Sequence, residues 1–465
     1  MATVPKQLVT EPVSGFPELG PATAIATERV IDVIRASYQR AGYAPLESPL
    51  VERTAILSAK ASGEIRTQMY GLRLLNPAPG ALDDSTSLGL RFDHTVQLAR
   101  YVAARTESGE FRFPFRRYSI GPVFRGEKPK AGRSRQFTQA DIDVIGYGSL
   151  SLLHDAEMVG VIDEIFSELG VGPFTIRIND RRLLEGILRS SGCDTEEKLR
   201  IARDAIDDML KEGFDRTVQL LSGIGIESGD ARALLESLAV GTTNAETIAS
   251  LRSRNFDSGF QEGVADLERV YTTLGHMGVR DSHVRIDPSL ARGLDYYTGS
   301  VFEASLNAHP DLSIAGGGRY DNLAEQFTDK HLPGVGISIG VTRLVARLIR
   351  EKMLDAKDTT VAPVLVTRVQ PDVYEAEYFR IAAELRRNGI GAEIYLADDR
   401  FKRQMDFAAK RGFSVVVIAG ERELEHHEGE KLAPLVIVRN MRTGDEASVP
   451  RTALVESVQD MLARR

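Results

Sequence analysis

The chain is poor in cysteine, with Cys193 as its single thiol among 465 residues. One cysteine excludes an internal disulfide framework and a zinc site built from several thiolates, and it fits a reducing, cytoplasmic setting. No apolar run is long enough to cross a bilayer. The first residues, MATVPKQLVTEP, also lack the basic start and apolar core of a secretory signal. We therefore expect a cytoplasmic protein without a membrane segment.

The composition is ordinary for a globular protein, with 42% hydrophobic and 27% charged residues. The length exceeds that of one typical core, so two or three domains are expected. A net charge of −8 argues against a protein that coats nucleic acid, although a local basic cluster can still bind phosphates. One such cluster is formed by Arg112, Arg116, Arg117, Arg125, Lys128, Lys130, Arg133 and Arg135.

The hydrophobic pattern divides the chain into two parts. Before residue 355 it predicts helices at 22–40, 95–105, 155–169 and 341–354 and strand-like runs between them, together with a purely helical insertion at about 181–280. The polar run EKMLDAKDTT is typical of a linker. Beyond it, alternating strands and helices predict a small α/β domain with a mostly parallel sheet.

One strand-like run carries an unusual polar face. Residues 135–144 alternate with period two, so that Thr138, Ala140, Ile142 and Val144 share one side. The other side holds an aromatic ring, an amide and charged groups: Arg135, Phe137, Gln139, Asp141 and Asp143. This face is either exposed to solvent or the floor of a site for a charged small molecule.

Three other segments allow a structural and a functional interpretation. Arg343 stands early in a helix, where it either reaches solvent or clamps a phosphate with the helix terminus. In ARGLDYYTGSVFE, the tyrosines after Arg292 either pack into the core beside a turn or form a binding segment. Asp93 and Thr95 either cap the next helix or contact a ligand.

Several apparent motifs carry little weight. The loop 126–134 has the wrong glycine spacing for a P-loop, and Gly316–Gly318 is more typical of a tight turn or bulge than of a dinucleotide site. His426 and His427 lie in a charged run without ligand spacing, so no metal site is expected there. Cys193 is expected to be inert.

Taken together and in this order, the segments resemble the histidyl-tRNA synthetase family of class II aminoacyl-tRNA synthetases. The stretch GPVFRGEKPKAGRSRQFTQADIDVIG resembles motif 2, GVGISIGVTRL resembles motif 3, and Pro49 in APLESPLVE matches the motif 1 proline, which in this class lies at the dimer interface. ARGLDYYTGSVFE resembles the histidine-specific peptide, and GGGRYDNL and LRFDHTVQLARY resemble the glycine-rich and amino-acid-binding segments. The tail is similar to the family's anticodon-binding domain.

The resemblance implies an α+β fold. A class II antiparallel-sheet catalytic domain would span residues 1–355, with the helical insertion at about 181–280, and an α/β anticodon-binding domain would span 362–465. It implies a histidine–tRNA ligase that activates L-histidine with ATP and Mg²⁺, transfers it to tRNA(His), and acts as a homodimer.

It also implies roles for residues at matching positions. Arg125 would hold the α-phosphate, Glu127 would help to place the nucleotide, Phe137 would stack on adenine, and Arg133 and Arg343 would bind the distal phosphates. Arg292 would face the reacting carboxylate and the α-phosphate. Histidine would be bound through Asp93, Thr95 and Gln139 at its α-ammonium group. Its imidazole would meet Asp143 and Tyr297, with Tyr296 and Tyr320 completing the pocket.

The sequence departs from the family pattern at Thr342, where the family often has glutamate, and in VSGFPELGPA. Two alternatives remain. The regulatory subunit of ATP phosphoribosyltransferase resembles the same catalytic fold but typically lacks the anticodon-binding domain and parts of the histidine-specific peptide. A tRNA-binding or signalling module derived from a synthetase would bind nucleic acid without forming an adenylate.

Overall fold

The computed structural model describes residues 10–59, 66–75, 87–109, 112–129, 132–238, 241–291, 296–424 and 434–464. It divides into two compact units, formed mainly by Arg29–Met353 and by Leu354–Arg465. The division falls within the polar run 351–360. On this basis we keep 1–355 and 362–465 as the proposed domain limits and describe each unit by itself.

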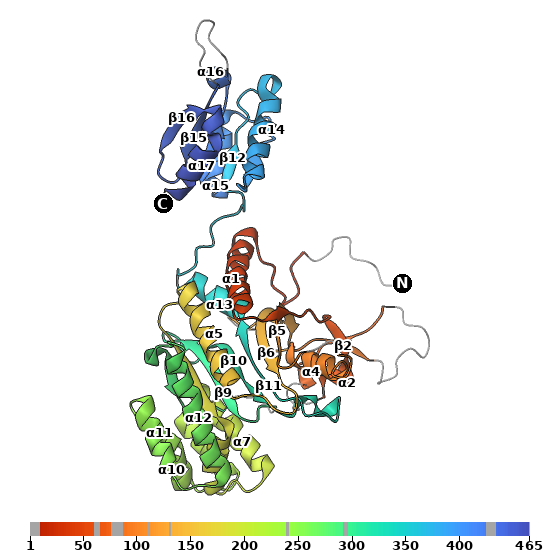
Figure 1. The fold of residues 1–465 in the computed structure, drawn as a ribbon, viewed down its shortest axis with the longest axis vertical. Helices are drawn as coiled ribbons and strands as arrows, with labels where there is room; N and C mark the ends of the chain where they lie inside the picture. The colour runs from red at the N-terminus through yellow and green to blue at the C-terminus, as the bar shows by residue number, and fades with distance from the viewer. Residues whose placement is uncertain are drawn as a thin grey trace. The chain divides into compact units, whose positions relative to one another are not determined.

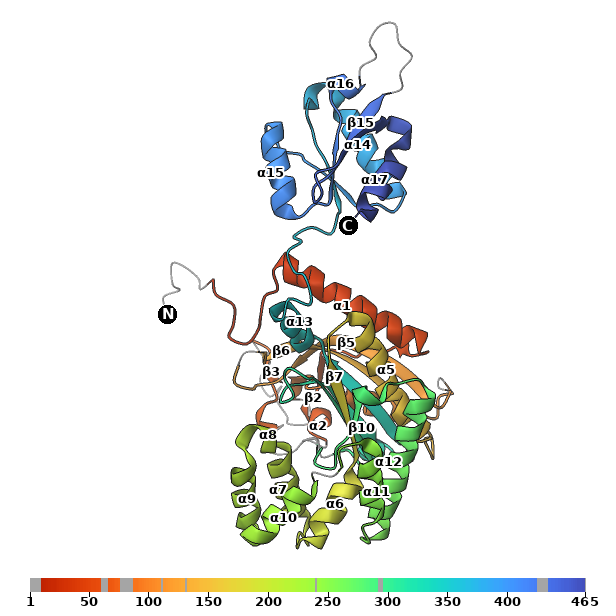
Figure 2. The ribbon, with the colours of Figure 1, turned by 90° about the vertical axis from the view of Figure 1, so that its left-hand side faces the viewer.

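An eight-stranded sheet forms the centre of the first unit (Figures 1 and 2). Its order is β1-β5-β6-β11-β10-β9-β7-β8. The edge pairs β1–β5 and β7–β8 are parallel, and the inner pairs are antiparallel. The predicted antiparallel-sheet catalytic fold is therefore confirmed. The strands are β1 (Ala44–Pro45), β5 (Phe115–Phe124), β6 (Gln136–Ile145), β7 (Phe174–Asp180), β8 (Val284–Ile286), β9 (Ser300–Leu306), β10 (Ser313–Tyr320) and β11 (Gly334–Gly340).

The helices that pack against this sheet include α1 (Pro21–Arg40), α5 (Leu153–Leu169) and α13 (Val341–Arg350). Tyr38 on α1 is fully buried, and its hydroxyl donates to the carbonyl of Ala140 in β6 at 2.9 Å. The apolar side of β6, including Ala140, Ile142 and Val144, is completely buried. The period-two pattern therefore identified the core side of this strand.

A small second sheet has the order β2-β4-β3. It consists of β2 (Val51–Arg53), β3 (Gly71–Leu72) and β4 (Leu88–Leu90), and the helices α2 (Thr54–Leu57) and α4 (Thr95–Ala103) accompany it.

The insertion between β7 and β8 consists, over its described residues 181–238 and 241–280, of helices joined by turns and short loops. Figure 1 shows its helices gathered beside one another, and α12 packs on α5, α6 and β7. Polar caps begin several of them: the side chains of Thr195, Thr243 and Asp257 each accept a backbone N–H of the first turn. The helices are α6 (Arg181–Ser190), α7 (Glu196–Asp207), α8 (Met209–Glu212), α9 (Phe214–Gly223), α10 (Ser228–Leu238), α11 (Asn244–Arg252) and α12 (Ser258–His276).

The second unit contains a five-stranded sheet of order β13-β12-β14-β15-β16. The pairs of β12 with β13 and β14 are parallel, whereas β14–β15 and β15–β16 are antiparallel. The expectation of a mostly parallel sheet is therefore wrong for half of the pairings, because the two last strands join as an antiparallel hairpin. The elements are β12 (Val364–Val366), α14 (Pro371–Arg387), β13 (Ala392–Ile394), α15 (Phe401–Arg411), β14 (Val415–Ile418), α16 (Glu421–Leu424), β15 (Leu435–Asn440), β16 (Glu446–Pro450) and α17 (Leu454–Ala463).

Across the described part of the chain, no helix combines the length and the apolar character that a membrane span requires.

The glycine run Gly316–Gly318 lies in the middle of β10, so the expectation of a tight turn or bulge is wrong. The register shift of this strand falls between Ser313 and Ala315 instead. A Cβ at Gly317 would approach the carbonyl oxygen of Gly336 to 2.1 Å, and one at Gly318 would approach the ring of Tyr297 to 2.7 Å. Close packing of the neighbouring strand and ring, rather than a turn, accounts for these glycines.

We predict that Gly317→Ala destabilises the first unit by about 1–3 kcal/mol or more, because the added methyl group collides with backbone that cannot move aside. Urea unfolding followed by circular dichroism measures this. Gly275→Ala in α12 is the control: its Cβ has free space, so it should stabilise by about 0.5–1 kcal/mol. Equal stability of the two variants would contradict the packing argument.

Candidate active site

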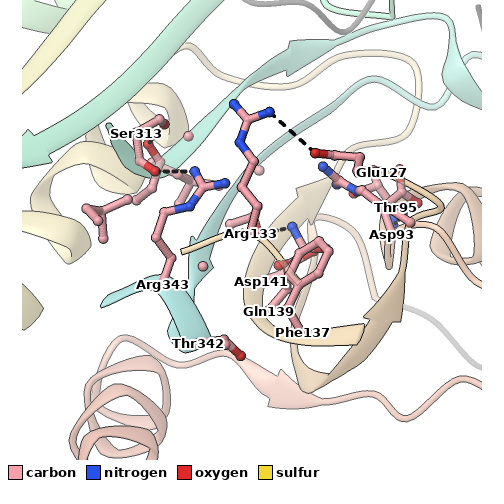
Figure 3. A pocket seen from close by; sticks show the side chains of 18 of the residues that line it. Asp93, Thr95, Glu127, Arg133, Phe137, Gln139, Asp141, Ser313, Thr342 and Arg343 are labelled. Carbon is pink, nitrogen blue, oxygen red and sulfur yellow. Dashed lines mark hydrogen bonds and ion pairs between the residues drawn. The ribbon is translucent and has the colours of Figure 1, made fainter. Parts of the chain in front are cut away.

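A cavity of about 350 Å³ opens on the polar side of β6 (Figure 3). It collects residues from β6 and the loop between β5 and β6, from β10 and β11, and from the starts of α4 and α13. Twelve of the residues singled out from the sequence line it: Asp93, Thr95, Arg125, Glu127, Arg133, Phe137, Gln139, Asp143, Tyr296, Tyr297, Tyr320 and Arg343. Arg292 lies outside the described residues, so its place at the site stays a prediction.

The floor of the cavity is built by strand register. Asp143 stands between Arg117 of β5 and Gly336 of β11, and Asp141 stands opposite Ser338 of β11. Both aspartates are nearly inaccessible, at 3% and 2% exposure for Asp141 and Asp143. Of the two interpretations of this polar face, the solvated one is therefore wrong, and the polar groups belong to a buried cavity floor.

A buried ion pair anchors this floor. Arg117 is 1% exposed, and its Nη2 lies 2.6 Å from Oδ2 of Asp143. The hydroxyl of Tyr320 donates to the other oxygen of Asp143, Oδ1, at 2.5 Å. Burial raises the pKa of Asp143, while Arg117 and Tyr320 oppose that shift. The carboxylate is thus held in one orientation from two sides.

The predicted cluster of basic side chains is consequently smaller than the sequence suggests. Arg117 is inside the protein, and Arg116 is paired with Glu157 at 2.5 Å and also donates to the carbonyl of Ala41. Neither arginine is free to bind phosphate at the surface, because strand alternation turns Arg117 inward and the ion pair with Glu157 holds Arg116.

Among the residues that the structure describes, three arginines line the cavity and supply positive charge to it. The guanidinium of Arg125 lies over two rings, 4.4 Å from the centroid of Phe92 and 5.2 Å from that of Phe137. Arg133 reaches Glu127 at 3.4 Å. In Figure 3, Arg133 lies between Arg343 and Glu127. Burial lowers the pKa of Arg125, with Asp93 opposing the shift.

Arg343 is held at the mouth of the cavity rather than in open solvent. Its Nη1 donates to the carbonyl of Ser313 at 2.5 Å, and the side chain is only partly exposed. This arrangement keeps the guanidinium beside the first turn of α13, where the helix N-terminus already favours anions.

The structure agrees with both interpretations of Asp93, as a helix cap and as a cavity residue. Its Oδ1 accepts the backbone N–H groups of Thr95 and Val96 at 3.1 and 3.2 Å, which caps α4, and Asp93 and Thr95 also line the cavity. Burial raises the pKa of Asp93, opposed by these hydrogen bonds and by Arg125. A capping role therefore does not remove the carboxylate from the site.

The tyrosines also combine packing with cavity lining. The rings of Tyr296 and Tyr297 are 4.8 Å apart between centroids, and Tyr320 meets Tyr296 edge-on at 6.0 Å. Tyr297 and Tyr320 belong to a buried cluster with Leu98 and Val301. Burial raises the pKa of the Tyr296 and Tyr320 phenols, so both remain protonated hydrogen-bond donors at neutral pH.

The cavity residues that were not among the predicted site residues include Asp141, Asp207, Ser338 and Thr342. Period two already places Asp141 with Gln139 and Asp143. Thr342, the departure from motif 3, accepts the backbone N–H of Thr138 at 2.9 Å and so ties α13 to β6. Asp207 comes from the end of α7, and no local signal in the helical insertion points to the site.

His426 and His427 lie beyond the described residues. Cys193 is buried, and burial raises the pKa of its thiol, which agrees with an unreactive side chain.

The comparisons with known proteins agree with this geometry. The Histidyl-tRNA synthetase family model matches residues 15–344, and an Anticodon binding domain model matches residues 361–461. The chain is 40% identical over 450 residues to a histidine–tRNA ligase of Clostridium tetani, covering 96% of this chain and 97% of that protein.

Solved structures give the same result for the fold. The structure of histidyl-tRNA synthetase from Nostoc sp. PCC 7120 superposes with a TM-score of 0.85 at 32% identity, covering 98% of this chain and 100% of that chain. An ATP phosphoribosyltransferase regulatory subunit/histidyl-tRNA synthetase from Bacillus halodurans C has a TM-score of 0.70 at 19% identity, covering 86% of this chain and 97% of that chain, and this likeness shows the fold alone.

The full-length relatives named as ligases favour the predicted enzyme over the regulatory-subunit alternative, and the predicted aminoacyl-tRNA synthetase class is confirmed. The match of the catalytic family model over most of the chain, with 40% identity to a full-length relative, establishes that the chain belongs to the histidyl-tRNA synthetase family.

Proposed function

We propose that this chain activates L-histidine with ATP and transfers the histidyl group to the 3′ end of tRNA(His), using the cavity on β6. The observation that carries the proposal is the convergence, in one cavity, of three arginines with buried hydrogen-bonding groups. Arg125, Arg133 and Arg343 come from distant segments and share the cavity with Asp93, Gln139 and Asp143. Fixed cations beside a polar pocket suit an anionic nucleotide and a small cationic amino acid.

In the first step, a carboxylate oxygen of histidine attacks the α-phosphorus of ATP. The new P–O bond forms the mixed anhydride, and the bond to the β-phosphate oxygen breaks to release pyrophosphate. Such a transfer depends on alignment and on stabilising charge at the phosphate oxygens. We assign Arg125 to the α-phosphate, because its guanidinium is held by the rings of Phe92 and Phe137. Arg292 is proposed to face the same oxygens and the attacking carboxylate.

The remaining nucleotide contacts follow from the same arrangement. Arg133 and Arg343 are proposed to bind the distal phosphates, and Phe137 to stack on adenine. Glu127 would hold the nucleotide near Arg133, with which it is already paired. Mg²⁺ would neutralise charge on the ATP phosphates, and the carboxylate oxygen of Glu127 is of the kind that Mg²⁺ prefers.

Histidine is proposed to bind with its imidazole against Asp143 and Tyr297, enclosed by Tyr296 and Tyr320. Asp143 has both oxygens engaged by Arg117 and Tyr320, and each carboxylate oxygen still has a lone pair available to an imidazole N–H. Asp93, Thr95 and Gln139 would surround the α-ammonium group. Analogues that leave these buried groups unpaired would be rejected by about four powers of ten or more, so no editing site is needed.

In the second step, a ribose hydroxyl of the terminal adenosine attacks the carbonyl carbon of the adenylate, and AMP leaves. We propose that the basic side chains of the loop after β5 and the helical insertion approach the acceptor stem, and that the domain at 362–465 binds the anticodon. The match to an Anticodon binding domain model supports the second assignment. A cytoplasmic location remains our prediction, since translation uses the product there.

A homodimer is proposed from Pro49 together with an apolar surface beside it. Large side chains exposed by more than a third gather on and around the small sheet: Leu50, Val51, Leu72, Leu74, Leu75 and Leu88. Leu72 and Leu88 stand directly opposite each other in β3 and β4. Exposed apolar side chains gathered in one part of the fold are typical of a protein–protein interface.

The direct test of the proposed reaction is ATP–pyrophosphate exchange with each of the twenty amino acids. We expect histidine alone to support exchange, and tRNA(His) to accept the label in a second assay, because the pocket pairs an imidazole and an ammonium group. Absence of histidine-dependent exchange, together with intact tRNA binding, would favour the non-catalytic alternative.

Arg125→Ala should reduce the exchange rate by about a hundredfold or more, the cost of removing one donor that stabilises charge in the transition state. The dissociation constant for histidine, measured by calorimetry without ATP, should change far less. Arg35→Ala on the exposed side of α1 serves as a matched control and should exchange normally. If Arg125→Ala kept near-normal exchange, its phosphate role would be wrong.

Leu88→Glu should shift the protein from dimer to monomer at micromolar concentration, because a carboxylate in the apolar surface would have to be desolvated on association. Sedimentation velocity gives the mass directly. Leu153→Glu replaces an equally exposed leucine on α5, outside this surface, and should leave the mass unchanged. An unaltered dimer for Leu88→Glu would place the interface elsewhere.

A further inference from the structure

Asp141 lies in the cavity without an assigned role. It stands on β6 between Gln139 and Asp143, and the three side chains share one side of the strand. It is as buried as Asp143, yet no described residue forms an ion pair with it comparable to that between Arg117 and Asp143. A buried carboxylate without a cation is costly, so its retention in a substrate cavity calls for a partner.

Hydrogen bonding leaves one oxygen of Asp141 open. Its Oδ1 is buried and has no partner in the described structure, although the side chain also interacts with Ser338. The neighbouring Gln139 donates its Nε2–H to the hydroxyl of Ser338 at 2.9 Å, and its Oε1 likewise has no partner. Two unused acceptors therefore sit two residues apart on the cavity floor. Acceptors in this state indicate that a donor is to be supplied by a ligand.

The charges around Asp141 favour a cationic ligand. Asp143 is neutralised by direct contact with Arg117, and Asp93 is balanced in part by Arg125. We propose that Asp141 is a further histidine-binding residue of this chain, whose free oxygen accepts a hydrogen bond from the α-ammonium group of the substrate. The inference rests on the proposed function and adds to it a further acceptor beside Asp93, Thr95 and Gln139.

The ammonium group suits these acceptors better than the imidazole does. An ammonium group offers three N–H donors, whereas each imidazole nitrogen offers at most one. Asp93, Gln139 and Asp141 offer carboxylate or amide oxygens to its donors, with the Thr95 hydroxyl beside them. The imidazole already has Asp143 and Tyr297 proposed for it. The position of Asp141 between these two sets makes it part of the selection of histidine, since it fixes the distance from the amino group to the ring.

The electrostatic surroundings agree with this geometry. Burial raises the pKa of Asp141 to about 7; Asp143 and Asp93 add to the shift, and Arg117 and Ser338 oppose it. Arg91, Arg125 and Tyr38 also interact electrostatically with Asp141. A bound ammonium group would favour the ionised carboxylate, so histidine binding near pH 7 should release protons from the protein.

The test uses the full-length protein and two competitive inhibitors. Histidinol keeps the amine and the imidazole, whereas imidazolepropionate lacks the amine. In Asp141→Asn, the KM for histidine and the inhibition constant of histidinol should rise about ten- to a hundredfold, as for loss of a hydrogen bond to a charged group. The inhibition constant of imidazolepropionate and the KM for ATP should stay within about threefold. Asp32→Asn, on exposed α1, controls for lost charge alone.

A measurement of thermal stability distinguishes a ligand-binding role of Asp141 from a structural role. The pKa of Asp141 is raised in the folded state, so its ionisation opposes folding as pH rises from about 4 to about 7. The melting temperature of Asp141→Asn at pH 8 should therefore equal or exceed that of the wild type. The difference between the two melting temperatures should be smaller at pH 5. A purely structural carboxylate would instead make the variant melt at a lower temperature at pH 8.

Equal weakening of both inhibitors, or no change for histidinol, would overturn the assignment of Asp141. If the wild type itself lacked histidine-dependent exchange, the proposed function would fail separately. Calorimetric binding of histidinol and imidazolepropionate to the wild type and to Asp141→Asn would still decide the role of Asp141.

Discussion

The ion pair of Arg117 with Asp143 is the interaction on which the cavity depends. It joins the two strands of the β5–β6 hairpin on their inward side and is almost completely removed from water. A buried pair of this kind contributes little net stability, because desolvation offsets the attraction, but loss of one partner leaves an uncompensated charge and is strongly destabilising. The pair therefore acts as a constraint on side-chain position. It fixes Asp143, and Tyr320 then fixes its second oxygen.

The surrounding backbone leaves room for these polar groups. A Cβ at Gly336 would approach Oδ1 of Asp143 to 2.1 Å, and one at Gly121 would approach a guanidinium nitrogen of Arg91 to 2.6 Å. Glycines on the strands beside β6 thus allow carboxylates and guanidinium groups to lie flat on the sheet, where a side chain would exclude them. The same absence of side chains leaves space above the sheet, in a cavity that the arginines also line.

Much of the fold and most of the site could be predicted from the sequence, for identifiable reasons. Period two on β6 gave the core side and the polar side correctly, because both sides are long and chemically distinct. Asp93, Arg125, Arg343 and Tyr296 were found through motif resemblance, and the structure brings them together. Local patterns do not predict strand register or burial. From the sequence Arg117 is one more basic residue, and only its strand partner, Asp143, shows that it belongs to the interior.

Other differences have the same cause. The glycine run of β10 predicts a tight turn or bulge, since the carbonyl of Gly336 that crowds Gly317 is distant in sequence. Asp207 lines the cavity from the helical insertion, where the hydrophobic pattern predicts only which side of each helix is buried. The period-two pattern places Asp141 on the polar side of β6. Only its unpaired oxygen, which the structure shows, distinguishes a ligand-binding carboxylate from one that merely lines the cavity. Long-range geometry, rather than local propensity, decides each of these cases.

The central claim is that arginines from distant segments converge on one nucleotide triphosphate beside a pocket for imidazole. A crystal structure with histidine and a non-hydrolysable ATP analogue tests it most directly. The account predicts the α-phosphate within hydrogen-bond distance of Arg125, the distal phosphates near Arg133 and Arg343, and the imidazole against Asp143. A nucleotide bound away from these guanidinium groups, or an imidazole that does not contact Asp143, would contradict it.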